Sequence, residues 1–124
     1  MNKVAIVLQA GPGTHESHAR MFHSMVYSKE LKERGHEVRL LFDGAGTEWL
    51  AKWAEPEDED DRRMGGLFNA LKDMELAYAV CDFCAGAFGV HQKLQAQDEP
   101  LVAEYMNHPS FAALFEEGFE VVVL

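Results

Sequence analysis

Short apolar runs recur along the chain, separated by longer amphipathic segments, and this alternation constrains the fold more than any other feature. The first run, Val4-Ala5-Ile6-Val7-Leu8, is apolar at every position, which predicts a strand covered on both faces. Similar runs predict strands at residues 37–42, 77–80 and 119–124. Apolar spacing and turn signals predict helices or helical turns over residues 15–34, 47–53, 62–75, 82–88, 91–97, 100–106 and 109–117. Strands that alternate with helices predict an α/β fold with a parallel sheet wound by right-handed crossovers.

The length and composition fit one folded unit. The chain has 124 residues, of which 48% are hydrophobic, and this is enough for a core without disulfide or metal support. No internal repeat or linker interrupts the sequence. We therefore expect a single domain over residues 1–124.

The net charge of −10 is concentrated in one segment. Residues 55–61 hold six of the 21 carboxylates, and the other 15 acidic and 11 basic residues leave a charge of −4. We interpret this segment as a solvated loop, with an acidic docking site as the alternative. Nucleic acid and anionic membranes both require a basic surface, so neither is an expected partner.

The beginning of the chain bears on location. The apolar run after Met1-Asn2-Lys3 is too short for a signal peptide, and a Gly-Pro-Gly turn follows it. No segment approaches the roughly 18 apolar residues of a membrane span. We expect a cytoplasmic protein without membrane insertion. In that compartment the two cysteines are expected to be thiols, ligands or catalysts rather than a structural disulfide.

Three loops are predicted to meet at the carboxyl edge of the sheet, where open parallel sheets bind their ligands. They cover residues 9–15, 43–47 and 81–84. The second loop, Asp43-Gly44-Ala45-Gly46-Thr47, matches neither a dinucleotide-binding nor a Walker motif. We interpret its glycines as turn residues and Thr47 as a helix cap, with anion binding as the alternative. The candidate ligand-binding residues of these loops are Gly11, His15, Asp43, Gly44, Gly46 and Thr47.

The Cys81-Asp82-Phe83-Cys84 pair is the strongest chemical signal and supplies the candidate catalytic residues, Cys81 and Cys84. Cys81 ends a predicted strand and precedes a helix, where backbone N–H groups are expected to lower the pKa of its thiol. A buried, inert cysteine is the alternative interpretation.

Three chemistries compete for the pair. Thioredoxin-like dithiol exchange fits poorly, because only 40 residues follow Cys84. A zinc site would need His91, or His15 and His18, to complete its ligands, and we expect no metal. The third chemistry is sulfur carriage, in which a thiolate accepts sulfur as a persulfide and the second thiol resolves it.

The segment Cys81-Asp82-Phe83-Cys84-Ala85-Gly86-Ala87-Phe88-Gly89-Val90 resembles the DsrE-like family, in the branch with a second cysteine at this spacing. The resemblance extends to residues 3–8, 35–38, 43–46 and 117–121. It implies a three-layer α/β/α Rossmann-like domain with a mostly parallel sheet of about five strands. It also implies assembly as a homotrimer or homohexamer. Many relatives have Arg where this chain has Phe88.

The family resemblance implies relay of sulfur between donor and acceptor proteins, with Cys81 as the carrier and Cys84 as the branch-specific thiol. Our leading hypothesis is therefore a sulfur carrier, a possible sulfurtransferase, that needs no cofactor. The alternative is a non-enzymatic oligomeric scaffold or small-ligand-binding module with inert cysteines. A zinc-binding or dithiol redox protein is the third option.

Overall fold

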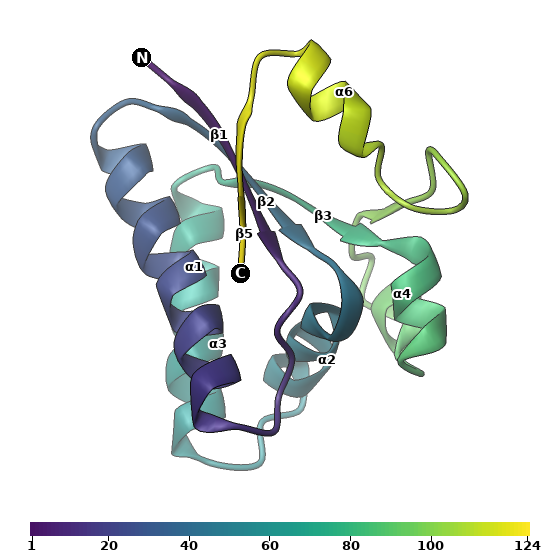
Figure 1. Ribbon diagram of the computed structural model, residues 1–124. Helices are drawn as coiled ribbons and strands as arrows, with labels where there is room; N and C mark the ends of the chain where they lie inside the picture. The colour runs from purple at the N-terminus through teal and green to yellow at the C-terminus, as the bar shows by residue number, and fades with distance from the viewer.

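The computed structural model describes residues 1–124 and contains one sheet of five parallel strands in the order β4-β3-β2-β1-β5 (Figure 1). The strands are β1 (Lys3–Leu8), β2 (Glu37–Phe42), β3 (Ala77–Cys81), β4 (Leu101–Val102) and β5 (Glu120–Val123). The prediction of an α/β fold with a mostly parallel sheet of about five strands is confirmed.

The helices connect successive strands and most begin with a side-chain cap. They are α1 (His15–Glu33), the 3₁₀ helix η1 (Gly44–Thr47), α2 (Glu48–Ala54), α3 (Glu59–Asp73), α4 (Asp82–Ala87), α5 (His91–Ala96) and α6 (Phe111–Glu116). Thr14 caps α1 by accepting the Ser17 N–H at 3.0 Å. Asp58 caps α3 and Ser110 caps α6 in the same way. These caps satisfy N–H groups that lack partners inside the helix.

The two faces of the sheet are covered unequally. Val4, Ile6 and Leu8 of β1 point to one face, where they join a cluster of 18 buried residues packed by α1, α2 and α3. Ala5 and Val7 point to the other face, whose buried cluster has five residues and is covered by α6. Figure 1 shows α1 and α3 on one side of the sheet and α6 on the other. The result is three layers, the α6 layer being the thinner.

One predicted element was wrong. Residues 100–106 were expected to form helical turns, but Leu101 and Val102 form β4, paired with Val80 and Cys81 of β3. The N–H of Val80 donates to the carbonyl of Pro100 at 2.9 Å. The segment therefore completes the hydrogen bonding of the free edge of β3. Local sequence patterns do not predict this pairing.

Two helix starts also differ from the prediction. The helix expected from residue 62 begins at Glu59, because Asp58 rather than a later residue is its cap. The helix expected from residue 109 begins at Phe111, because Pro109 precedes the cap Ser110 instead of opening the helix.

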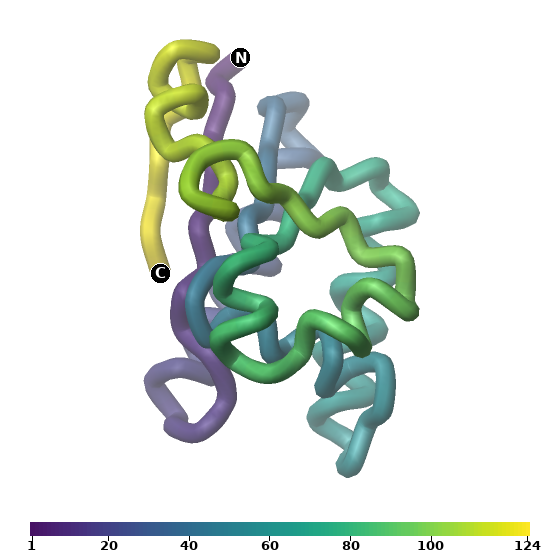
Figure 2. Tube along the Cα trace, turned by 90° about the vertical axis from the view of Figure 1, so that its right-hand side faces the viewer, coloured from purple at the N-terminus to yellow at the C-terminus, as the bar shows by residue number.

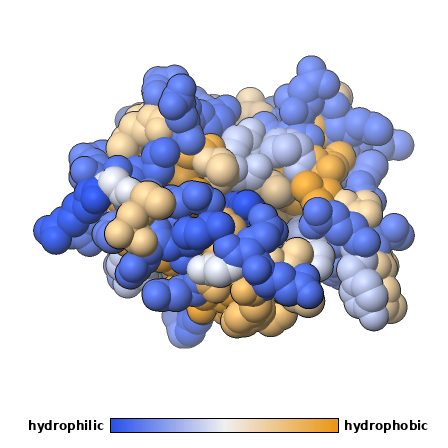
Figure 3. Space-filling model, turned by 90° about the horizontal axis from the view of Figure 1, so that it is seen from above, coloured by the Kyte–Doolittle hydropathy of each residue, from blue (hydrophilic) through white to orange (hydrophobic).

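The end of the molecule where the strands begin is mostly hydrophilic, with separate smaller hydrophobic areas (Figure 3). None of the helices combines the length and the apolar character that crossing a membrane requires.

Candidate functional site

Cys81 and Cys84 lie at the junction of β3 and α4. Cys81 is the last residue of the strand and the N-cap of the helix, and its Sγ accepts the backbone N–H of Cys84 at 3.5 Å. Cys84 follows one turn later, and both cysteines are free thiols. The change from strand to helix therefore places the two sulfur atoms next to each other.

The two thiols have different surroundings. Cys81 is fully buried, whereas Cys84 is half-buried. Burial is the main cause that raises the pKa of the Cys81 thiol to about 12, and the neighbouring Cys84 thiol and Asp43 carboxylate contribute in the same direction. The N–H of Cys84 opposes this shift but does not outweigh burial. The expectation that the helix start lowers the pKa of Cys81 was wrong, because that argument ignored desolvation.

Asp43 connects the thiols to the neighbouring strand ends. Its Oδ1 lies 3.6 Å from Cys84 Sγ, and its Oδ2 accepts a hydrogen bond of 2.8 Å from the side-chain amide of Gln9. Gln9 follows β1 and Asp43 follows β2. Side chains from three adjacent strand ends thus meet at the carboxyl edge, as the parallel topology predicts.

His108 is a member of this site that the sequence did not reveal. One of its ring nitrogens and the two cysteine sulfurs all lie within 4.8 Å of one another. The His108 ring stacks on that of Phe83, with centroids 4.8 Å apart.

The backbone before His108 explains how it reaches the thiols. Met106 and Asn107 have φ angles of 47° and 62°, in the left-handed region that non-glycine residues rarely adopt. The turn they form is held against α4, since the Phe83 N–H donates to the Asn107 carbonyl at 2.9 Å. Figure 2 shows this turn curling back beside α4 before the chain enters α6. No spacing of residues in the sequence predicts this contact.

Two of the histidines considered from sequence, His18 and His91, contact carboxylates rather than the thiols. His18 Nε2 lies 2.6 Å from Asp60 Oδ2, and His91 Nε2 lies 2.8 Å from Asp82 Oδ1. His15 is exposed at the start of α1 and lines a separate hollow with His18. The zinc ligand sets considered from sequence, built on these three histidines, are therefore not assembled around the cysteines.

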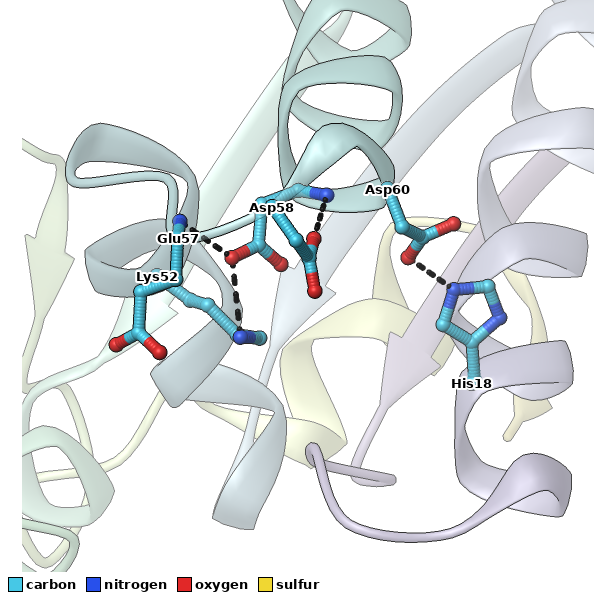
Figure 4. Close-up of polar contacts among 6 residues, drawn as sticks. His18, Lys52, Glu57, Asp58 and Asp60 are labelled. Atoms are coloured by element: carbon cyan, nitrogen blue, oxygen red, sulfur yellow. Dashed lines mark hydrogen bonds and ion pairs between the residues drawn. The ribbon is translucent and has the colours of Figure 1, made fainter.

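The acidic segment is more ordered than a solvated loop. Asp61 is only 2% exposed and accepts hydrogen bonds of 3.0 Å from both Lys52 Nζ and the Glu57 N–H (Figure 4). Burial alone would raise the pKa of Asp61, but the N–H of Glu57 and the Lys52 ammonium outweigh it and hold the pKa below its usual value. Part of the acidic segment thus anchors α3 to α2.

The glycine-rich loop is packed tightly against the end of β1. A Cβ on Gly46 would collide with the Leu8 carbonyl, and one on Gly11 would collide with Ala45. Thr47 is buried, and its hydroxyl donates to the Gly44 carbonyl at 2.9 Å. Thr47 makes no side-chain cap bond to α2, so that expectation was wrong. The contacts favour the structural interpretation of these glycines.

A cavity of about 290 Å³ lies beside the site on the thinly covered face of the sheet. Its apolar wall includes Val7, Leu41 and Leu114. Asp43 and His108 also line it and link it to the thiols.

The parallel sheet and the thiols gathered at its carboxyl edge define a small α/β protein with a cysteine-centred site. The model of the DsrE/DsrF-like family matches residues 2–124, and the chain belongs to this family.

Among curated proteins, the chain is similar to an uncharacterised protein of Methanocaldococcus jannaschii. The two are 25% identical over 104 residues, which cover 84% of this chain and 79% of the relative.

Two solved structures share the fold. A conserved protein of unknown function from Bacteroides thetaiotaomicron has a TM-score of 0.67 at 17% identity, with 99% of this chain and 95% of that chain covered. The ychN protein of E. coli has a TM-score of 0.61 at 14% identity, with both chains covered completely at 100%.

Proposed function

We propose that this protein is a sulfur carrier that accepts and passes on sulfur as a cysteine persulfide. The observation that carries the proposal is the approach of two thiols and an imidazole to within 4.8 Å at the carboxyl edge of the sheet. Membership of the DsrE/DsrF-like family supports the same assignment. The proposed carrier is Cys81, and Cys84 is the supporting thiol.

Sulfur uptake needs one displacement. A cysteine thiolate attacks the outer sulfur of a donor persulfide, a new S–S bond forms on the cysteine, and the donor S–S bond breaks. The donor leaves as a thiolate with the electron pair of that bond. His108 is the nearby base that accepts the proton of the attacking thiol and returns it to the departing thiolate.

The carried sulfur then has two exits. An acceptor thiolate can attack the outer sulfur and regenerate the free cysteine. Alternatively, the Cys84 thiolate attacks Sγ of the Cys81 persulfide, which forms a disulfide between them and expels hydrosulfide. Burial of Cys81 protects the persulfide from solvent, whereas Cys84 and His108 are more exposed and face an incoming donor first.

Mass spectrometry tests the proposal directly. Reduced protein in a chelating buffer is treated with glutathione persulfide, and the intact mass is recorded over time. Wild type is expected to gain one sulfur atom, Cys81→Ser to gain none, and Cys84→Ser to keep the adduct longer. His91→Gln, whose ring pairs with Asp82, is the matched control and should behave as wild type.

The outcomes distinguish an incorrect assignment of the two thiols from an incorrect function. An adduct that forms in Cys81→Ser but not in Cys84→Ser would exchange their roles while retaining sulfur carriage. If neither substitution changes uptake, or if wild type gains no sulfur, the sulfur-carrier proposal fails.

A second candidate is a small-ligand-binding module with inert cysteines. It is favoured by the full burial of Cys81 and by the cavity of about 290 Å³ beside it. Thiol alkylation discriminates between the two functions. Slow reaction of both cysteines in the native state, with fast reaction only after unfolding, would favour the binding module.

We further infer that the protein works in the cytoplasm, between donor and acceptor proteins, as a homotrimer or homohexamer. The exposed aromatic side chains of α6 support self-association, since Phe111 and Phe115 are each 56% exposed.

A further inference from the structure

The thiol site also contains a set of metal ligands. Cys81, Cys84 and His108 each offer one ligand atom, and these three atoms lie within 4.8 Å of one another. They come from the end of β3, from α4 and from the turn before α6. Two segments that are distant in the sequence, the β3–α4 junction and the turn before α6, therefore converge on one point.

His108 is held in a state suited to ligation. Its Nδ1 lies 2.6 Å from the carbonyl oxygen of Met106 and donates to it, so in the neutral imidazole Nε2 carries the lone pair. A backbone carbonyl on the second ring nitrogen is the usual support of a metal-binding histidine. The Phe83 ring fixes the plane of the imidazole by stacking on it.

The backbone before His108 also supports a role of this residue as a metal ligand. Two consecutive non-glycine residues, Met106 and Asn107, adopt left-handed conformations to bring His108 back toward the thiols. Left-handed conformations of non-glycine residues are strained, and such residues cluster at functional sites.

The distances between the three ligand atoms are close to those in a zinc site. With Zn–S bonds of about 2.3 Å, the sulfurs of a tetrahedral site lie about 3.8 Å apart. Ligand atoms within 4.8 Å of one another need to contract by only about 1 Å. The Asp43 carboxylate lies 3.6 Å from Cys84 Sγ, and the cavity that it lines leaves room for a fourth ligand.

We propose that Cys81, Cys84 and His108 form a three-ligand zinc site whose fourth position is open toward the cavity. Thiolate and imidazole are the ligands that zinc prefers, and binding displaces one proton from each thiol as the Zn–S bonds form. This site goes beyond sulfur carriage and does not depend on it. Zinc on both thiolates blocks persulfide formation, so the metal would switch a carrier off.

Cobalt substitution tests the site without an activity assay. Reduced, metal-free protein is titrated with Co²⁺, whose tetrahedral thiolate complexes absorb in the near ultraviolet and the visible, and Zn²⁺ is then added as competitor. Wild type is expected to bind one Co²⁺ with both absorptions, and zinc is expected to abolish them. A folded wild type without the thiolate absorption would overturn the proposal.

The imidazole ligand is tested by a matched pair of variants. His108→Gln is expected to weaken zinc binding by at least about tenfold, whereas His91→Gln should bind as wild type. Equal affinities of His108→Gln and His91→Gln would refute the role of His108.

Two further measurements keep the result independent of folding and of sulfur chemistry. Zinc should slow alkylation of both cysteines in the wild-type protein by at least about tenfold, and unchanged rates would count against the site. Sulfur loading is measured in chelating buffer, so failure of that reaction leaves the metal result unaffected. Zinc that binds while sulfur is not taken up would retain this inference and reject the carrier.

Discussion

At the scale of single residues, close packing decides which glycines are replaceable. Gly46 has ordinary backbone angles but lies directly against the Leu8 carbonyl, so even a methyl group does not fit. Gly66 lies on the exposed side of α3 with nothing near its Cβ position. The sequence identifies both as glycine, but only the fold distinguishes their roles.

This contrast predicts opposite effects of the same substitution. Gly46→Ala is expected to lower the free energy of unfolding by about 1–3 kcal/mol, because the loop must move off the end of β1. Gly66→Ala should raise it by about 1 kcal/mol, because alanine favours the helix. Urea unfolding followed by circular dichroism measures both. A Gly46→Ala protein as stable as wild type would contradict the proposed close contact.

At the scale of elements, sequence periodicity predicted four of the five strands and most of the helices. It missed β4, because two residues carry no periodic pattern and their pairing depends on the free edge of β3. Only part of the site could be predicted from the sequence, for a related reason. Cys81, Cys84 and Asp43 lie at or just after strand ends and therefore meet at one edge, but His108 reaches the site through a left-handed turn that no local pattern specifies.

The link between α2 and α3 gives a pH-dependent prediction. Asp61→Asn is expected to lower the free energy of unfolding at pH 7 by about 1–3 kcal/mol, because it removes the charged partner of Lys52. The pKa of Asp61 is lowered by folding, so its contribution is complete above the ordinary carboxyl pKa. That contribution declines as pH falls through the lowered value.

Thermal unfolding of both proteins between pH 7 and pH 2 tests this expectation. The difference in Tm should shrink toward the acid end of the range. Asp73→Asn, at the exposed end of α3, is the control and should show little difference at any pH. A constant difference between wild type and Asp61→Asn would exclude the charge as its origin.

At the scale of the whole molecule, the two faces of the sheet differ in coverage. The larger core lies under α1, α2 and α3, whereas only α6 covers the smaller cluster. The aromatic residues of α6 remain exposed beside the cavity that borders the thiols. The α6 layer therefore places the proposed assembly surface next to the proposed thiol site.

The assembly proposal is tested by light scattering after size-exclusion chromatography. Wild type is expected as three or six copies, and the double substitution of Phe111 and Phe115 by Ser should lower the mass to that of one copy. Tyr27→Ser, which removes a similarly exposed aromatic side chain from α1, should leave the mass unchanged. A monomeric wild type at micromolar concentration would contradict the proposal.

The hydrogen bond between the Phe83 N–H and the Asn107 carbonyl has a thermodynamic consequence. It ties the segment that carries the thiols to the segment that leads into α6. If copies associate through α6, a ligand on the thiols and the association of copies become linked equilibria. If the ligand changes the affinity between subunits by some factor, association must change the affinity for the ligand by the same factor. A change in oxidation, sulfur load or metal at Cys81 would then change the fraction of the protein that is assembled.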